Sequence, residues 1–217
     1  MTPRDEIHVG AVGNQGGVLQ RRAWLTGDEI CRRERVRLTT PLRTVVDCCR
    51  HLDDGWALAV ADAAARFHGV TGEELTHHIL GAAPGPGRAR VTWVADHLDA
   101  RSESALESLN RAVLIQAGFQ PEPQVWISTD RTRYRVDLLD RANRVISEAD
   151  GRRKYEQEEQ PATPWEDKLR QDSLWDSGFE IVRFTMADYY SRRAAYLARY
   201  RRAVLRADQR SVPRLWG

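Results

Sequence analysis

Three acidic residues crowd together in the segment RYRVDLLDRANRVISEADGRRKY, residues 133–155. Asp137 lies in the first of two strand-like runs, and Glu148 and Asp150 lie in the second. Alternation along a strand places Glu148 and Asp150 on one face, and antiparallel pairing of the two runs brings Asp137 near Glu148. Bare carboxylates at that separation repel one another, and a divalent cation with oxygen ligands removes the repulsion. The segment therefore predicts a site for Mg²⁺ or Mn²⁺.

A divalent cation held by these carboxylates would polarise a phosphodiester and lower the pKa of a bound water molecule. The alternative is a solvent-facing hairpin, in which Asp137 pairs with Arg135 or Arg144. The other two carboxylates would then pair with Arg152 and Arg153. Surface ion pairs of this kind are common and contribute little to stability. The residues of the hairpin alone leave both interpretations open.

The elements that would position these residues follow in the order helix, three strands, helix, strand and helix. ALESLNRAVLIQAG carries apolar residues at helical spacing and ends at Gly118, which predicts the first helix. WEDKLRQDSLWDSG predicts a second helix that ends at Gly178, with Trp165 and Trp175 packed into the core. The strands are predicted in QVWIS, TRYRVDLLD, NRVISEAD and EIVRFT, before a basic terminal helix. This order predicts an α/β domain over residues 100–217, a mixed sheet flanked by helices.

Residues 1–99 predict a mostly helical region with short strands at its start. Thr40 can cap a helix that begins at Pro41, the usual place for proline at a helix start. Thr71 and Glu74 have the spacing of a capping box, and two further helices are predicted in GWALAVADAAARFHG and RARVTWVADHL. We expect this region to give structural support to the second domain.

The composition excludes several classes of protein. No apolar run approaches the ~18 residues of a membrane span, and the N-terminus lacks the hydrophobic block of a secretory signal. Three cysteines (Cys31, Cys48 and Cys49), with no CxxC spacing, suit neither a disulfide framework nor a zinc site. We therefore expect a reduced, cytoplasmic protein without a membrane partner.

Separated pieces of the second half resemble one group of nucleases. The pieces SALESLNRAVLIQAGF, YRVDLL, ISEADGRRKY and WEDKLRQDSLWDSGFEIVRFTMAD fall within residues 102–190. They look like actinobacterial proteins with a very-short-patch-repair-like (Vsr-like) endonuclease domain of the PD-(D/E)XK restriction-nuclease superfamily. The resemblance implies a restriction-endonuclease-like fold and cleavage of DNA phosphodiester bonds with Mg²⁺ or Mn²⁺.

The same resemblance implies roles for individual acidic residues. Asp137 matches the metal-binding aspartate, Glu148 the acidic position of the (D/E)-x-K motif, and Glu107 a glutamate that completes the metal shell. The chain departs from the motif at its final lysine, where Asp150 stands. The resemblance therefore leaves the general base open, with Asp150 either completing the metal shell or ordering water.

Basic residues supply the other candidates. Only two of the 33 basic residues are lysines, Lys154 and Lys168, and a lysine can move a proton whereas arginine stays protonated. We expect one of the two to replace the motif lysine, although a helical pair of Lys168 with Asp172 is the alternative. Residues 188–217 hold eight basic and two acidic residues, so the terminal helix is either a phosphate-contacting element or a solvated helix packed by its tyrosines. The expected nucleic-acid contacts are Arg170, Lys154, Arg192, Arg193, Arg201 and Arg202.

The first half carries a second resemblance. RLTTPLRTVVDCCRHLDDGWALAVADAAARFHGVTGEEL is similar to the helical region between a winged-helix reader and the nuclease domain in those proteins, and comparable architecture occurs in AbiEi-type antitoxins. About 40 residues precede the first helix, too few for a winged helix. The alternatives to an endonuclease are a non-catalytic DNA-binding or AbiEi-like regulator that retains a nuclease-like scaffold, and a bare helical interaction module. DNA is the expected partner, and a homodimer or a partner protein of a toxin–antitoxin or defence system stays open.

Overall fold

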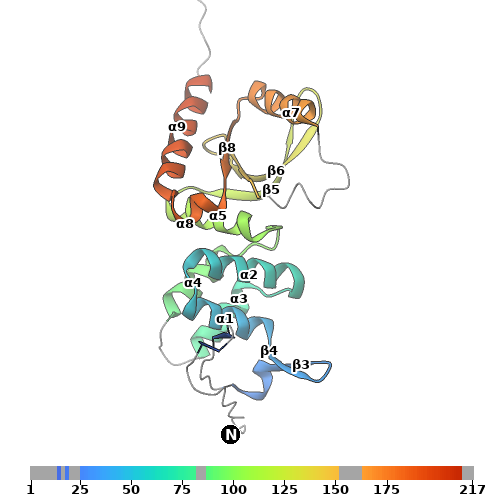
Figure 1. The fold of residues 1–217 in the computed structure, drawn as a ribbon, viewed down its shortest axis with the longest axis vertical. Helices are drawn as coiled ribbons and strands as arrows, with labels where there is room; N and C mark the ends of the chain where they lie inside the picture. Colours follow the sequence, from blue (N-terminus) through green and yellow to red (C-terminus); the bar gives the residue numbers. More distant parts are fainter. Residues whose placement is uncertain (1–13, 16–17, 20–24, 82–86, 152–162, 212–217) are drawn as a thin grey trace, which may run out of the picture.

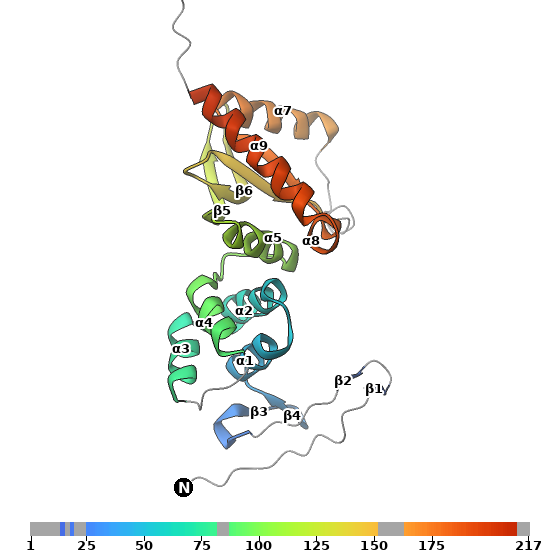
Figure 2. The same cartoon turned by 90° about the vertical axis from the view of Figure 1, so that its left-hand side faces the viewer.

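The computed structural model describes residues 14–15, 18–19, 25–81, 87–151 and 163–211. The chain forms a helical N-terminal region followed by a four-stranded mixed sheet with flanking helices (Figure 1). The view turned by 90° shows the same stacking, with the helical region at one end and the sheet at the other (Figure 2). The predicted order of helices and strands in the second half is confirmed from α5 (Ala105–Gln116) to β8 (Glu180–Phe184).

Two short antiparallel hairpins precede the first helix. One joins β1 (Asn14–Gln15) to β2 (Val18–Leu19), and the other joins β3 (Ile30–Arg33) to β4 (Val36–Thr39). A 3₁₀ helix, η1 (Gly27–Glu29), lies directly before β3. The predicted short strands at the start of the chain are therefore present.

Four helices follow: α1 (Pro41–His51), α2 (Asp54–His68), α3 (Gly72–Gly81) and α4 (Arg88–His97). The Thr40 hydroxyl accepts the N–H of Arg43 at 3.3 Å, so the predicted cap of α1 is confirmed. Thr71 and Glu74 exchange the two hydrogen bonds of the predicted capping box. The core of these helices is apolar and includes Val45, Val46, Cys49, Ala57, Ala61, Leu75, Val91 and Val94.

The sheet has the order β5-β6-β7-β8. Helix α5 (Ala105–Gln116) leads into β5 (Pro121–Ser128), β6 (Arg133–Asp140) and β7 (Val145–Ala149), which pair antiparallel. Helix α7 (Pro164–Asp176) then returns the chain so that β8 (Glu180–Phe184) pairs parallel with β7. The sheet is therefore mixed, as predicted.

The basic end of the chain forms two helices, α8 (Met186–Tyr190) and α9 (Arg193–Ser211), where a single helix was predicted. A capping box at Thr185 starts the short helix α8. That helix ends at Tyr190, and α9 begins at Arg193. Tyr196 and Tyr200 of α9 are fully buried against one face of the sheet. The predicted packing of this helix by its tyrosines therefore describes how α9 is held against the sheet.

The two faces of the sheet carry different helices. Helices α5 and α9 cover one face, where Tyr196 packs with Leu109 and Phe184. Leu174 of α7 packs with Ile146 on the other face, and Figure 1 shows α7 and α9 on opposite sides of the sheet. The prediction that Trp165 and Trp175 pack the core is wrong, because they are 64% and 50% exposed on the outer side of α7.

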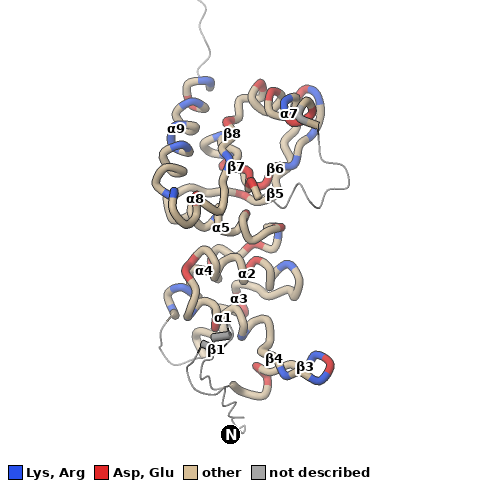
Figure 3. The backbone as a smooth tube through the Cα atoms, viewed as in Figure 1, with Lys and Arg blue, Asp and Glu red and all other residues tan. Residues whose placement is uncertain are grey.

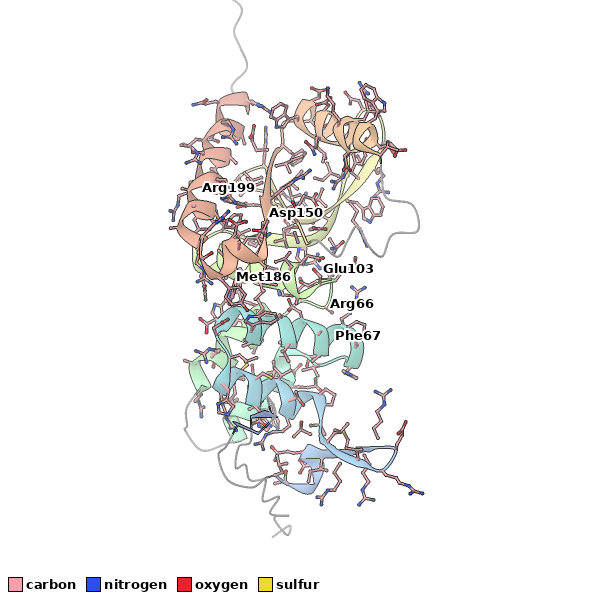
Figure 4. All side chains as sticks on the ribbon, viewed as in Figure 1. Arg66, Phe67, Glu103, Asp150, Met186 and Arg199 are labelled. Carbon is pink, nitrogen blue, oxygen red and sulfur yellow. The ribbon has the colours of Figure 1, made fainter. Side chains whose placement is uncertain are left out.

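A buried ion pair joins the helical region to the sheet domain. Both carboxylate oxygens of Asp62 on α2 accept hydrogen bonds from Arg111 on α5, at 2.7 and 2.8 Å. Asp62 also accepts the N–H of Asp99, and Arg111 donates to the carbonyl oxygen of His97. At the surface, Glu103 pairs with Arg66 of the helical region, next to it in Figure 4, and with a β6 arginine. The helical region and the sheet domain are thus joined by ion pairs both inside and at the surface of their interface.

Close packing at the start of α3 gives a testable consequence. A Cβ added at Gly72 would overlap the backbone carbonyl oxygen of Ala95, which belongs to α4 and cannot swing away like a side chain. We expect Gly72→Ala to lower the free energy of unfolding by about 1–3 kcal/mol through overpacking, as measured by urea denaturation. Gly81→Ala is the matched control at the end of the same helix, because open space surrounds that position. Equal stabilities of the two variants would contradict this packing.

Candidate active site

The register of the sheet aligns the candidate carboxylates. Leu138 of β6 pairs with Ser147 of β7, so the next step along the antiparallel ladder sets Asp137 beside Glu148. On the far side of β7, Glu148 pairs with Arg183 of β8. Asp137 and Glu148 are therefore the next residues of the two strands beyond the last paired residues, Leu138 and Ser147.

Hydrogen bonds hold both carboxylates in place. Asp137 is 8% exposed, and its Oδ2 accepts the backbone N–H of Ala149 at 2.8 Å. The Oε1 of Glu148 accepts a hydrogen bond from Arg170 of α7 at 2.7 Å. The side chain of Glu148 therefore lies on the face of the sheet that α7 covers.

Glu107 lies in the first turn of α5 and is almost fully buried, at 2% exposure. Its oxygens accept hydrogen bonds from the backbone N–H of Glu103, from the hydroxyl of Ser104 and from the amide of Gln124. Burial raises the pKa of Glu107, and the negative charge of Asp137 raises it further, against the hydrogen bonds that lower it. Glu107 is therefore close enough to Asp137 for the two carboxylates to repel each other.

Gln124 is a member of the site that the sequence analysis missed. It lies on β5 beside Asp137, between the flanking pairs Pro123–Leu138 and Val125–Val136. Its backbone has a φ of 56°, in the left-handed region that side-chain-bearing residues rarely adopt, and its amide donates to Glu107 at 2.8 Å. The strand pairing of β5 with β6 could have predicted that Gln124 lies opposite Asp137, but it could not have predicted the left-handed φ.

Asp150 stands just past the end of β7, where its N–H donates to the carbonyl oxygen of Phe184 at 2.7 Å. Its carboxylate lies 3.9 Å from the guanidinium of Arg183 and is about a third exposed. Figure 4 shows Asp150 within the sheet domain, above Met186 and Glu103 in that view. Asp150 is thus near Glu148 along the strand but has its own positive partner.

The predicted basic residues differ in their positions relative to the site. Arg170 contacts the site through Glu148 and also donates to the carbonyl oxygen of Arg135 at 3.1 Å. Lys168 is exposed, and neither the predicted pair with Asp172 nor any other hydrogen bond or ion pair links its side chain to a described residue. Lys154 lies outside the described residues.

The terminal arginines lie on the other side of the sheet from Arg170, because α9 and α7 cover opposite faces. Arg193 stacks over the ring of Tyr189, with 5.2 Å between the guanidinium carbon and the ring centroid. Arg192, Arg201 and Arg202 are exposed. The structure therefore does not gather these arginines around the carboxylates.

The ion pairs of the solvent-facing alternative differ from those observed. Arg135 pairs with Glu103 at 2.8 Å, and Glu148 pairs with Arg170 of α7. Arg152 and Arg153 lie outside the described residues. Glu148 is thus turned toward α7, and two of the three carboxylates, Glu148 and Asp150, have guanidinium partners.

The donor set suits a hard divalent cation in kind, since Asp137, Glu148 and Glu107 offer carboxylate oxygens. No group of three or more His, Cys, Asp or Glu side chains in the described part of the chain is gathered as a ready metal shell. Mg²⁺ commonly keeps several waters and binds through one or two carboxylates. Glu107 forms no ion pair with a described basic residue, so its buried charge lacks the cation that would balance it.

Comparison with known proteins finds no match to this chain among protein families, curated proteins or solved structures. Within the part of the chain that the structure describes, no helix is both long and apolar enough to cross a bilayer.

The raised pKa of Glu107 gives a pH-dependent expectation. The folded chain binds this proton more tightly than the unfolded chain, so the stability linked to Glu107 is present below the ordinary pKa of 4.5 and falls as pH rises above it. Glu107→Gln mimics the protonated acid. In buffer with EDTA, we expect the melting temperature of the variant to gain on that of the wild type as pH rises from about 4.5 to 7.

Glu166 provides a control of opposite sign for this measurement. The N–H of Thr163 lowers the pKa of Glu166, so its contribution is lost as pH falls through the lowered pKa. The melting temperature of Glu166→Gln should therefore approach that of the wild type from below as the pH falls. The melting temperature of Glu107→Gln should lose its gain over the wild type in the same acidic range. A Glu107→Gln melting temperature that follows the wild type at every pH would contradict the raised pKa.

Proposed function

We propose that this chain is a metal-dependent endonuclease that hydrolyses DNA phosphodiester bonds, with Asp137, Glu148 and Glu107 around the cation. The observation that carries the proposal is the buried Glu107 carboxylate, which lacks a described positive partner and repels Asp137. Such an arrangement costs free energy by itself, and a divalent cation offsets the cost. The Vsr-like resemblance of the sequence and a four-stranded mixed sheet with flanking helices support the same proposal.

Each residue has a distinct task in this proposal. A bound Mg²⁺ or Mn²⁺ would supply Lewis-acid activation of water and phosphate. Asp137, fixed by the N–H of Ala149, and Glu148 hold the cation on neighbouring strands. Gln124 fixes the orientation of Glu107 through its amide, so that Glu107 keeps its buried position beside Asp137.

Arg170 is the basic residue that the fold directs at these carboxylates. Its guanidinium binds Glu148 at 2.7 Å in the free chain, and a guanidinium is well suited to a phosphate oxygen. We assign phosphate contact to Arg170, and to Asp150 the ordering of water at the end of β7. Lys168 would act as the proton-transfer group only after its exposed side chain turns toward the site.

A second function is favoured by one observation, the ion pair between Arg170 and Glu148. A carboxylate already neutralised by a guanidinium needs no cation, which suits a DNA-binding regulator that keeps the nuclease-like scaffold without cleaving. This regulator would bind DNA in a salt-sensitive way and leave it intact.

The deciding experiment incubates the full chain with supercoiled plasmid and with branched or mismatched duplexes. Mg²⁺ or Mn²⁺ is added, with and without EDTA, and strand breaks are counted on gels. The endonuclease predicts breaks that require the metal and disappear in Asp137→Ala. Salt-sensitive DNA binding with no metal-dependent break would favour the regulator, and neither binding nor cleavage would leave only an interaction module.

Isothermal titration with Mn²⁺ tests the site without relying on turnover. We expect heat of binding from the wild type and a clear loss of affinity in Glu148→Gln, which removes one charged ligand while keeping the shape of the side chain. Equal Mn²⁺ affinity of the two proteins would place the cation elsewhere.

A further inference from the structure

The β3–β4 hairpin is the most basic element of the helical region. Its residues 30–39, ICRRERVRLT, hold four arginines and one glutamate. Figure 1 shows it projecting from the helical region, and Figure 3 shows basic residues on both of its strands. The endonuclease proposal makes no use of this hairpin.

Three arginines of the hairpin have no described side-chain partner. No side-chain hydrogen bond or ion pair joins Arg32, Arg33 or Arg35 to another described residue, and Arg32 of β3 stands directly opposite Arg37 of β4. Nearby Arg43, by contrast, is paired with two carboxylates, Glu29 and Asp47. A partner with many negative charges would supply counter-charges to these arginines.

Apolar side chains accompany the arginines on the same strand. Val36 and Leu38 of β4 are 58% and 44% exposed, and they alternate there with Arg37. The major groove of B-form DNA admits a two-stranded β-ribbon, where guanidinium groups meet phosphates and guanine edges and apolar groups meet thymine methyls. A projecting two-stranded ribbon with both kinds of side chain matches duplex DNA in shape and in charge.

We propose that the β3–β4 hairpin binds duplex DNA, with Arg32, Arg33 and Arg35 contacting phosphates along the groove. The inference rests on the proposed function in taking DNA as the partner, and it adds a binding element remote from the carboxylates. The helical region is then a DNA-contacting part of the molecule as well as a support for the sheet domain.

The test measures binding of the full chain to a fluorescent duplex by anisotropy, in EDTA and over a series of salt concentrations. The variant R32Q/R33Q/R35Q removes the three arginine charges that are proposed to meet phosphates. We expect its plot of log K against log salt to be shallower than that of the wild type by about 2.7, or about 0.9 for each phosphate that is no longer neutralised. Near 0.1 M salt, binding should weaken by at least about tenfold.

Two control variants separate the position of the charges from net charge. R32K/R33K/R35K keeps the positive charges, so it should retain most of the wild-type salt slope. R50Q/R88Q/R101Q removes three arginines from other parts of the helical region and its connection, and its slope should change by less than about 1. An equal loss of binding in this second control would overturn the proposal, because it would make the effect one of overall charge.

An unchanged salt slope in R32Q/R33Q/R35Q would also overturn the proposal, as would hairpin-dependent binding to anionic vesicles without binding to the duplex. The absence of metal separates this inference from the endonuclease. Hairpin-dependent binding without cleavage after Mg²⁺ is added would keep the hairpin and reject the nuclease. Cleavage by a triple variant that binds normally would keep the nuclease and reject the hairpin.

Discussion

Asp137→Asn is expected to abolish metal-dependent cleavage, with a fall in rate of about a thousandfold or more. Metal-ion catalysis supplies several kcal/mol to the transition state, and each 1.4 kcal/mol, approximately, is a factor of about ten in rate. The asparagine oxygen can still accept the N–H of Ala149, so the fold should survive and circular dichroism should be unchanged. The measurement is the initial rate of plasmid nicking in Mg²⁺ and in Mn²⁺.

Asp130→Asn makes the same chemical change on an exposed residue in the loop between β5 and β6. We expect its nicking rate to stay close to that of the wild type. If Asp137→Asn cuts DNA as fast as Asp130→Asn, the carboxylate of Asp137 has no part in the reaction and the proposed site is wrong.

The second large effect concerns the joint between the two parts of the chain. Arg111→Met leaves the carboxylate of Asp62 buried at 1% exposure without its guanidinium. Removing one partner of a buried pair costs about 3–5 kcal/mol of stability, because the other charge stays uncompensated. We expect the urea midpoint to fall accordingly, when unfolding is followed by tryptophan fluorescence and by circular dichroism.

The double variant Asp62→Leu/Arg111→Met removes both charges and should be more stable than Arg111→Met alone. Arg101→Met is the control at the surface, where the pair with Asp99 is solvent-exposed and contributes less than about 1 kcal/mol. A double variant as unstable as Arg111→Met would attribute the loss to packing of the arginine side chain, not to charge.

Local chemistry made much of the fold predictable. Gly118 and Gly178 have φ values of 88° and 87° just past α5 and α7, so the helix ends follow from residues that favour this conformation. The break between α8 and α9 was missed, because Ser191 at the end of α8 is only a weak local signal. The run of arginines and tyrosines beyond it has a continuous helical pattern, which outweighed the short signal.

Only the part of the site that depends on the pairing of neighbouring strands was predictable from the sequence. Asp137 and Glu148 stand one step beyond the last paired residues of two neighbouring strands, which pair through a short turn that local sequence fixes. The partner of Glu148 is Arg170, 22 positions along the chain, and its identity depends on how α7 packs on the sheet. The left-handed backbone of Gln124 is likewise set by tertiary contacts, because no glycine or asparagine marks it.

Strand β5 closes one edge of the sheet, and its first half is a poor template for another strand. Pro121 and Pro123 have no N–H to donate, and the left-handed φ of Gln124 bends the backbone between them and Val125. A second copy of the chain could not extend the sheet here with an unbroken hydrogen-bond ladder. Association of two copies by strand addition along the first half of β5 is therefore disfavoured.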